Sequence, residues 1–240
     1  NEMTPESIVV LELSSFQLMN MEISPNISVI TNISPNHLDI HKSYEEYIDS
    51  KKNIFKYQSK DGILILNYDN NITREFEKEA KGKVIFFSSK TKLENGIIYD
   101  DGKIKSCENS IRRHILNTKN IYLKGVHNFE NICAAIAATA PLVDIDTQVK
   151  VISEFKGVHH RLEYVRDVNG VKWYNDSASS SPTRTIAGIN AFEEGLTLIT
   201  GGYDKNLDYT PMAKPIVDKV KTLLLIGQTS EKIYNAVKQE

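Results

Sequence analysis

Short apolar runs alternate along this chain with segments in which apolar residues recur every three to four positions. The apolar runs predict buried strands, because a strand covered on both faces of a sheet needs no polar side. The periodic segments predict amphipathic helices that cover such a sheet. Four strands are predicted in the first part of the chain, at residues 8–13, 27–32, 62–67 and 83–87. This alternation is typical of an α/β fold with a parallel sheet.

Helices are predicted between and after these strands. The clearest one follows Ser43, because Glu46 three residues later completes the pattern of a capping box. Its apolar positions recur near the helical period, at Tyr44, Tyr47, Ile48, Ile54 and Phe55. Further helices are predicted at residues 72–80, 127–139 and 147–154. The intervening residues 96–117 predict a small β region, with Asp101-Gly102 as a hairpin turn.

The pattern restarts near Lys156, and we place a domain boundary there. Strands at 162–168 and 171–174, joined by Asn169-Gly170, predict a hairpin. The remaining predicted elements are a helix at 183–192, a strand at 196–200, a helix at 212–219, a strand at 222–226 and a helix from Ser230. We therefore expect a first domain at residues 1–156 and a partial Rossmann-like α/β domain at residues 157–240. The second stops within its pattern, so we expect the chain to be a piece of a longer protein.

Composition excludes several classes of protein. Lys and Arg number 29 against 31 Asp and Glu, a net charge of −2, whereas nucleic-acid wrappers and basic membrane-surface proteins need an excess of Lys and Arg. Cys107 and Cys133 form no C-x-x-C pair, which argues against a disulfide scaffold or a Cys-rich zinc site and favours a reducing compartment. The longest apolar runs fall well short of the roughly 20 residues of a membrane helix. We expect no leader of the basic-then-apolar kind at the start of the chain. We expect a cytoplasmic protein.

Candidate metal ligands follow the first two predicted strands. Glu12 lies near the carboxyl end of the first strand, at the edge where α/β sheets bind ligands. His37, Asp39 and His41 alternate in the loop after the second strand, and all three are potential ligands. We expect His37 to reach the same sheet edge as Glu12. The alternatives are a solvent-facing glutamate and a histidine that only forms hydrogen bonds.

Other polar residues suit a nucleotide or an anionic substrate. Asn128 and Asn131 share one face of a helical turn, where their amides can pair with a heterocycle or cap the helix. Arg161 offers a fork for phosphate or carboxylate. Residues 175–182 form a polar strand-to-helix loop suited to an anion, and residues 201–205 add a second loop with a cation. Taken singly, these features are also typical of ordinary helix caps.

Together these motifs resemble the Mur ligase family. The resemblance covers essentially the whole chain and rests on residues 12–18 (Glu-Leu-Ser-Ser-Phe-Gln-Leu), 36–39, 50–55, 125–131, 160–163, 175–177 and 201–205, which occur in the family's order. Residues 12–18 resemble the branch that adds D-glutamate to UDP-N-acetylmuramoyl-L-alanine; the later motifs are shared more widely.

The resemblance implies a fold and an activity. The fold is a central ATPase-type sheet flanked by helices, with a small β subregion, followed by a partial glutamate-binding domain. The activity is an ATP-dependent ligation in peptidoglycan synthesis, and so in cell-wall formation, cell shape and cell division. ATP phosphorylates the alanyl carboxylate, and the amine of D-glutamate attacks the acyl phosphate. ATP and Mg²⁺ are the implied cofactors, and we expect a monomer that binds neither nucleic acid nor membrane.

The resemblance also implies roles for individual residues. Glu12 and His37 hold magnesium, together with a carbamate on Lys51, although the neighbouring Lys52 is equally plausible. A lysine that reacts with carbon dioxide becomes an anionic oxygen ligand. Asn128 and Asn131 contact adenine, while Arg161 and Asp176 close over the phosphates and ribose. The residues implied to bind the other substrates are Ser14, Ser180 and Lys205.

Two departures limit what this chain does alone. Ala178 stands where many relatives carry a lysine, which affects how glutamate is anchored. No G-x-x-G-K-[ST] loop, which cradles phosphates, occurs in these residues. We therefore expect the 240-residue chain by itself not to ligate.

Three alternatives remain open at this level. One is a metal-dependent hydrolase built on His37, Asp39 and His41, with His159 and His160 as further ligands. A second is a nucleotide-binding module without catalysis. The third is a sister ligase that adds lysine, diaminopimelate or a glutamyl-folate unit.

Overall fold

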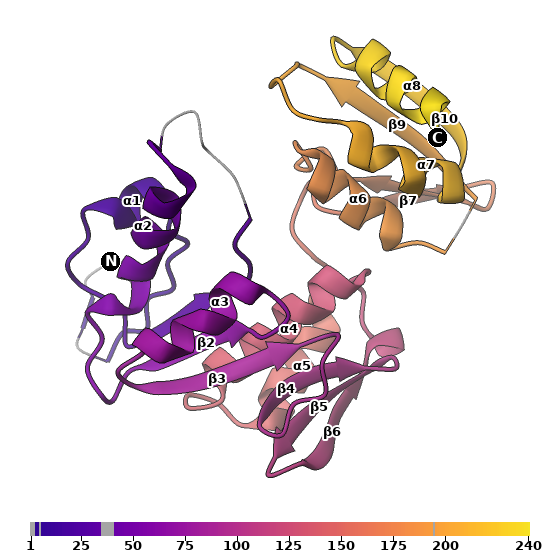
Figure 1. The fold of residues 1–240 in the computed structure, drawn as a ribbon. Helices are drawn as coiled ribbons and strands as arrows, with labels where there is room; N and C mark the ends of the chain where they lie inside the picture. The colour runs from indigo at the N-terminus through magenta and orange to yellow at the C-terminus, as the bar shows by residue number, and fades with distance from the viewer. Residues whose placement is uncertain (1–2, 5, 35–40, 194) are drawn as a thin grey trace. The chain divides into compact units, whose positions relative to one another are not determined.

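The structure is a computed structural model that describes residues 3–4, 6–34, 41–193 and 195–240 (Figure 1). The chain forms two compact units. One consists of residues 1–98, 105–113 and 133–142, and the other of residues 99–104, 114–132 and 143–240. The predicted boundary near Lys156 stays a prediction.

Six strands form one sheet in the order of the sequence. They are β1 (Ile27–Ile30), β2 (Ile63–Asn67), β3 (Lys83–Ser88), β4 (Gly96–Asp100), β5 (Lys103–Glu108) and β6 (Ile111–Asn117). The strands from β1 to β4 pair in parallel. Two-residue turns at Asp101-Gly102 and Asn109-Ser110 have positive φ at both positions, as tight hairpin turns require. The predicted parallel sheet with a small β subregion is confirmed.

Helix starts in this part of the chain are fixed by local caps. Ser43 Oγ accepts the N–H of Glu46 at 3.2 Å and so caps α2 (Tyr44–Lys56). The Glu46 carboxylate accepts the N–H of Lys42 at 2.6 Å, so the predicted box is only half formed. A complete capping box, not predicted from the sequence, joins Ser14 and Gln17 at α1 (Ser15–Met19). The other helices are α3 (Asn71–Glu75), η1 (Phe76–Glu79), η2 (Thr118–Asn120), α4 (Val126–Thr139) and α5 (Ile145–Glu154).

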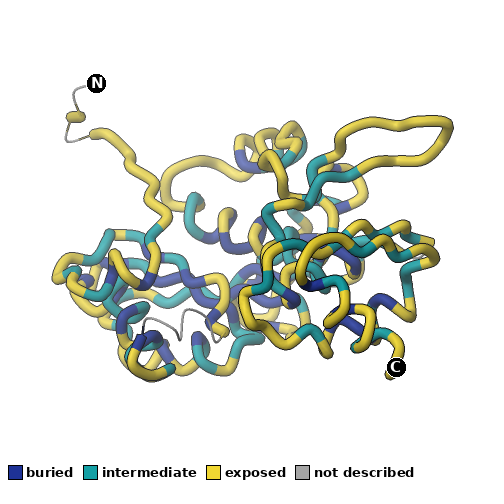
Figure 2. Tube along the Cα trace, turned by 90° about the horizontal axis from the view of Figure 1, so that it is seen from above, coloured by how far each residue is buried: buried dark blue, intermediate teal, exposed yellow. Residues whose placement is uncertain are grey.

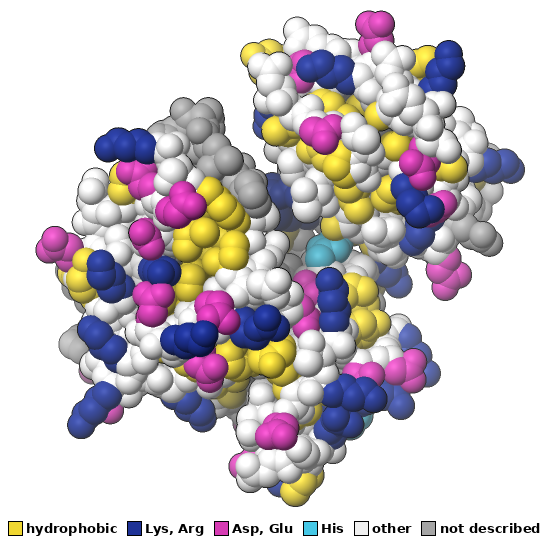
Figure 3. All heavy atoms as spheres, in the orientation of Figure 1, with side chains coloured by type: hydrophobic (Ala, Val, Ile, Leu, Met, Phe, Trp, Pro, Cys, Tyr) yellow, Lys and Arg dark blue, Asp and Glu magenta, His cyan; other side chains and the backbone are white. Residues whose placement is uncertain are grey.

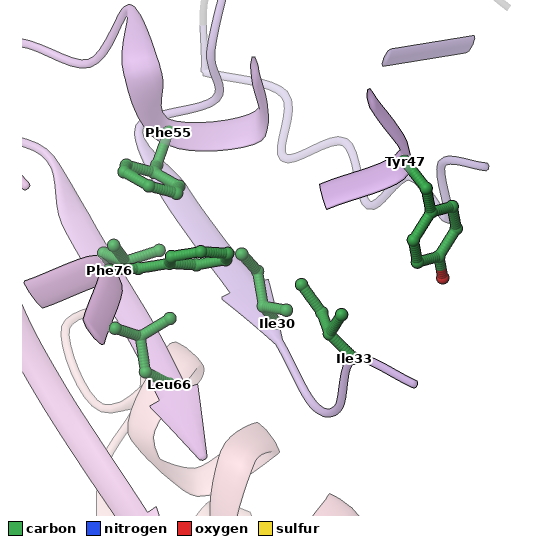
Figure 4. Packing of buried hydrophobic residues seen from close by; sticks show 7 residues of the cluster. Ile30, Ile33, Tyr47, Phe55, Leu66 and Phe76 are labelled. Carbon is green, nitrogen blue, oxygen red and sulfur yellow. The ribbon is translucent and has the colours of Figure 1, made fainter. Parts of the chain in front are cut away.

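The main core lies where α2 and η1 pack on β1 and β2. The rings of Phe55 and Phe76 have centroids 5.5 Å apart and lie near Ile30 and Leu66 (Figure 4). Burying each such side chain contributes about 1.5–3 kcal/mol to the stability of the fold. This packing fixes the helix that carries the two candidate lysines.

The predicted first strand is wrong. Residues 8–13 form neither helix nor strand, and Figure 2 shows them within an exposed stretch of chain. Ile8 is 70% exposed and Val10 is 91% exposed. A buried parallel strand needs a hydrogen-bonded neighbour and cover on both faces. Among the described strands, β1 pairs only with β2, so no neighbour takes up this apolar run.

The C-terminal residues contain two pairs of strands. β7 (Glu163–Val168) and β8 (Val171–Asn175) form the predicted hairpin, and β9 (Leu196–Gly202) pairs in parallel with β10 (Val220–Gly227). The accompanying helices are α6 (Pro182–Asn190), η3 (Thr210–Met212), α7 (Ala213–Lys219) and α8 (Ser230–Gln239). Their core is built on Ile189, Met212, Ile216 and Ile233. Each predicted element in this region is confirmed within a few residues of its expected ends.

Three further observations bear on the composition argument. Both cysteines are buried, and neither forms a disulfide. Figure 3 shows basic side chains interspersed with acidic ones over the face drawn. In the part of the chain that is described, no helix has the length and apolar character needed to cross a bilayer.

Candidate functional site

The two adjacent lysines of α2 have different surroundings. Lys52 Nζ lies 2.7 Å from Glu79 Oε1 and 3.5 Å from Asp49 Oδ1. The hydrogen bond with Glu79 raises the pKa of Lys52 above its ordinary value. Lys51 forms no ion pair at this distance with a described carboxylate, and burial lowers its pKa, with the Glu12 charge opposing the shift. The structure therefore distinguishes two residues that the sequence left equivalent.

Lys51 faces the segment that carries Glu12. Its Nζ makes a long hydrogen bond of 3.5 Å to the carbonyl oxygen of Leu13. The Glu12 carboxylate is exposed and near enough to act on the charge of Lys51. The next residue, Ser14, is occupied in the cap of α1: its N–H and Oγ both donate to Gln17 Oε1, at 2.8 and 3.0 Å. Although residues 8–13 are not a strand, Glu12 still lies beside Lys51.

Helices α1 and α2 are joined by side-chain bonds that fix this arrangement. Asn53 Nδ2 donates to the carbonyl oxygens of Leu18 and Met19 at 2.9 and 3.2 Å. Each of these bonds crosses from α2 to α1. The backbone next to Ser14 and the helical turn that carries Lys51 are therefore held together by the fold.

His41 is a buried packing residue. Its Nε2 lies 2.9 Å from Ser15 Oγ, and only 3% of the residue is exposed. The ring stacks on Phe16 with centroids 5.2 Å apart and meets Tyr47 edge-on at 5.4 Å. Its Nδ1 has no hydrogen-bond partner among the described residues and lies 3.8 Å from Glu46 Oε2. This environment gives no support to an open metal ligand.

The other predicted ligands of that loop, His37 and Asp39, lie outside the described residues. Among the residues that are described, no three His, Cys, Asp or Glu side chains are grouped as a metal site would need. His159 and His160 are exposed and contact Glu163. The hydrolase alternative therefore gains no support from the described part of the chain.

The two asparagines at the start of α4 differ in the way the sequence left open. Asn128 Nδ2 donates to the carbonyl oxygen of Lys124 at 2.7 Å, so this amide is occupied at the helix start. Asn131 is exposed on the same face. The neighbouring His127 has its pKa lowered by burial, while Asp176 raises it and Arg161 lowers it further. The start of α4 therefore lies within electrostatic reach of two other predicted nucleotide residues.

Asp176 contacts the backbone next to Arg161. Asp176 Oδ1 accepts the N–H of Leu162 at 3.0 Å, directly after Arg161. The Arg161 side chain is exposed and forms no ion pair with a described carboxylate. Asp176 is thus partly occupied as a structural acceptor, whereas the guanidinium is open to an anion.

The polar loop between β8 and α6 is folded on itself. Asn175 Oδ1 accepts the N–H of Ser177 at 3.1 Å, and the carbonyl oxygen of Asp176 accepts the N–H of Ser179 at 2.9 Å. Ser180 is exposed at the end of this loop, one residue before the N-cap of α6. Ala178 is partly buried, and its N–H donates to the carbonyl oxygen of His160 at 3.0 Å.

The loop after β9 presents Lys205 to solvent. Its neighbour Asp204 lies 2.5 Å from Lys232 Nζ, while Lys205 is exposed and forms no ion pair with a described acid. A Cβ on Gly201 would lie 1.9 Å from the carbonyl oxygen of Ile226 on β10, so only glycine fits at this end of β9, just before the loop. The charge pattern leaves Lys205 as the open cation of this loop.

Glu163 and Asn175 lie within the motifs of the family resemblance, which implies no role for either of them. The structure shows both bonded to His160, next to Arg161. One feature of the sequence could have indicated a role for Glu163. It is a carboxylate two residues after Arg161, at the start of a predicted strand. A strand-end position is ambiguous on its own, because it does not reveal which backbone groups lie opposite.

This chain is similar in sequence to known proteins. A family model described as the Mur ligase middle domain matches residues 1–139. A UDP-N-acetylmuramoylalanine–D-glutamate ligase of Acetivibrio thermocellus is 54% identical over 232 residues, covering 97% of this chain and 50% of the relative. One from Clostridium botulinum strain Langeland is 50% identical over 236 residues, covering 98% of the chain and 50% of the relative. The chain spans about half the length of these curated relatives.

Solved structures share the fold at low sequence identity. A MurF crystal structure from Acinetobacter baumannii matches with a TM-score of 0.72 at 15% identity, covering 93% of this chain and 51% of that one. MurC from Thermotoga maritima matches with a TM-score of 0.67 at 17% identity, covering 94% and 51%. These two structures show that the fold is shared, and the family model and the relatives show the family. On that basis, the chain belongs to the Mur ligase family.

Proposed function

We propose that this chain forms part of an ATP-dependent ligase that joins D-glutamate to UDP-N-acetylmuramoyl-L-alanine in peptidoglycan synthesis. Two relatives about half identical to it carry the name of that ligase. A MurF ligase from Thermotoga maritima was solved in complex with ADP, which fits a nucleotide site in this fold. The observation that carries the proposal is the placement of a partly buried Lys51 beside Glu12, while Lys52 is paired with Glu79.

The donor set fits magnesium if Lys51 carries a carbamate. Mg²⁺ prefers oxygen ligands, and an ammonium repels it, so an unmodified lysine beside Glu12 would oppose metal binding. Carbamylation requires a neutral amine. Lys52 is held as a cation by Glu79, whereas Lys51 has no such partner among the described residues. Glu12 and the carbamate of Lys51 would hold the ion with His37, and the bound ion would supply charge stabilisation to phosphoryl transfer.

The chain's own residues supply binding and orientation. Asn131 offers a free amide for the edge of adenine. Arg161 presents a fork to phosphate oxygens, with charge-assisted hydrogen bonds. Lys205 and the loop that ends at Ser180 offer a cation and N–H groups to the carboxylates of D-glutamate. The D-glutamate amine then attacks the acyl phosphate at the alanyl carbonyl carbon, and phosphate leaves as the amide bond forms.

The test uses a hybrid ligase, in which residues 1–240 of this chain replace the matching half of the Acetivibrio thermocellus relative. We expect phosphate release that needs both ATP and D-glutamate, and its loss in Lys51→Ala but not in Lys52→Ala. Phosphate release with lysine or diaminopimelate instead of D-glutamate would favour a sister ligase. The same assay on the 240-residue chain alone is expected to show no ligation, because it lacks the phosphate-cradling loop.

A further inference from the structure

Arg161 lies between two residues in an unusual backbone conformation. His160 has φ of 67° and Leu162 has φ of 44°. L-residues other than glycine rarely occupy this left-handed region, because the Cβ approaches the backbone carbonyl oxygen. Two such residues around one arginine persist only where the surroundings impose them.

Glu163 imposes the conformation on the N-terminal side of Arg161. Its Oε2 accepts the N–H of His160 at 2.8 Å, and its Oε1 accepts the Nδ1–H of His159 at 2.7 Å. Asn175 Nδ2 donates to His160 Nδ1 at 2.9 Å from the neighbouring strand β8. The hydrogen bond from the His160 N–H is the main reason that the pKa of Glu163 lies below its ordinary value. The carboxylate is therefore an ionised acceptor with both oxygens in use.

Asp176 imposes the conformation on the other side. It accepts the N–H of Leu162 at 3.0 Å, and Ala178 N–H closes the loop onto the carbonyl oxygen of His160 at 3.0 Å. A Cβ on Gly188 would lie 2.8 Å from Asp176 Oδ2, so helix α6 leaves this carboxylate just enough room. Every one of these contacts reaches the backbone or an imidazole, and none reaches the guanidinium of Arg161. The network fixes the backbone on both sides of Arg161, and none of its groups pairs with the guanidinium.

We propose that Glu163 is a positioning residue for Arg161: it holds the His160–Leu162 backbone so that the guanidinium is presented to the polyphosphate of ATP. This inference rests on the proposed function of Arg161. A free arginine side chain has many rotamers, and fixing its backbone reduces the conformational cost of binding an anion. The charge-assisted bonds of a carboxylate are stronger than those of an amide, so an ionised residue suits this role.

The test is a double-mutant cycle in the hybrid ligase defined above. Glu163→Ala is expected to raise KM for ATP about tenfold, within the range known for misplaced binding groups, and to leave KM for D-glutamate unchanged. Arg161→Ala should raise KM for ATP at least as much. The double variant should be no worse than Arg161→Ala alone, because Glu163 acts through Arg161. Glu163→Gln should recover part of the loss, since one amide oxygen can replace only one of the two carboxylate acceptors.

Asp167→Ala is the matched control. Asp167 lies on the same strand, and its carboxylate also accepts a backbone N–H, that of Gly170 at 2.8 Å, but at the far end of the hairpin. We expect this variant to leave KM for ATP unchanged. An equal loss in Asp167→Ala would overturn the positioning role, because it would show a general effect of hairpin stability.

The remaining outcomes separate the two proposals. Suppose that Arg161→Ala raises KM for ATP and that the double variant shows the full effects of both substitutions. The positioning role of Glu163 is then wrong, and the ATP role of Arg161 stands. If Arg161→Ala leaves KM for ATP unchanged, the assigned role of Arg161 fails, and the inference falls with it. Amide exchange in the 240-residue chain gives a second readout. Glu163→Ala should speed exchange of the His160 N–H, and unchanged protection there would also overturn the inference.

Discussion

Lys52 forms an ion pair with Glu79, with 2.7 Å between Nζ and Oε1. The contact joins α2 to the short helix η1, two elements separated by β2 and α3 in the sequence. It also keeps Lys52 charged and turned away from the neighbouring Lys51, whose Nζ points to the carbonyl oxygen of Leu13. The pair therefore distinguishes Lys52 from Lys51, which forms no ion pair with a described carboxylate.

Carbamate should form on Lys51 and not on Lys52. Carbon dioxide reacts with the neutral amine, and the ion pair with Glu79 keeps Lys52 protonated. We expect one carbamate carbon signal in an NMR spectrum of the hybrid ligase in ¹³C-bicarbonate. Lys51→Ala should remove the signal and Lys52→Ala should retain it; the reverse pattern would show that the two lysines were assigned the wrong way round.

Asp69 should make the free energy of unfolding decrease at acidic pH. Burial alone raises the pKa of this carboxyl, but hydrogen bonds from Ser89 N–H, the Ser88 and Thr91 hydroxyls and Lys90 N–H together lower it below the ordinary value. The unfolded chain therefore binds this proton at higher pH than the folded chain. The stabilisation is fully present at neutral pH and is lost as pH falls from about 4 through the folded-state pKa.

Urea unfolding across this pH range measures the effect. Asp69→Asn should cost about 1–3 kcal/mol at pH 7, because the amide cannot accept all of these donors. Its free energy of unfolding should then change less between pH 7 and pH 3 than that of the parent chain. A parallel decline in both proteins would assign the acid sensitivity to other carboxylates.

Gly201→Ala should destabilise the C-terminal part of the chain far more than Gly170→Ala. Both glycines have positive φ, so a Cβ strains the backbone in both variants. Only the Cβ on Gly201 would also clash, at 1.9 Å from the carbonyl oxygen of Ile226, whereas nothing lies within 4 Å of that on Gly170. Thermal unfolding of the two variants compares them directly, and equal losses would contradict the close approach of β9 and β10.

His41→Ala should lower stability without changing metal affinity. The variant removes a buried ring that packs on Phe16 and Tyr47 and bonds to Ser15. Large-to-small changes of buried aromatic residues cost about 3–5 kcal/mol, and a ring of this size should lie near the lower end. Isothermal titration with Mg²⁺ and Zn²⁺ at a temperature where the variant is folded provides the check. Loss of tight zinc binding would favour the hydrolase alternative.

Polar substitutions in residues 8–11 should be nearly neutral in the 240-residue chain. Val10 is 91% exposed, so Val10→Thr should change the free energy of unfolding by less than about 0.5 kcal/mol. Leu66→Ala, at a fully buried position of the same unit, should cost about 2–5 kcal/mol. A large loss in Val10→Thr would show that the predicted first strand is buried after all.

Much of the fold followed from local patterns. Several local features appear where the sequence predicted them. They are the cap at Ser43, the turns at Asp101-Gly102 and Asn169-Gly170, and the apolar runs of β2 and β3. These signals act over a few residues, so they need no knowledge of distant contacts. The strand predicted at residues 8–13 was wrong for the same reason. Apolar side chains favour burial, but a local pattern does not reveal which strand would pair with them.

The sequence by itself determined the order of elements from β1 onward and the family resemblance. Tertiary structure decided which of two adjacent lysines is paired with a described carboxylate, which asparagine amide is bonded at the start of α4 and which acid holds the backbone around Arg161. Those distinctions depend on partners 3 to 38 positions away in the chain. Periodicity and motif spacing report local preference, whereas the state of a charged or polar group depends on what the folded chain brings against it.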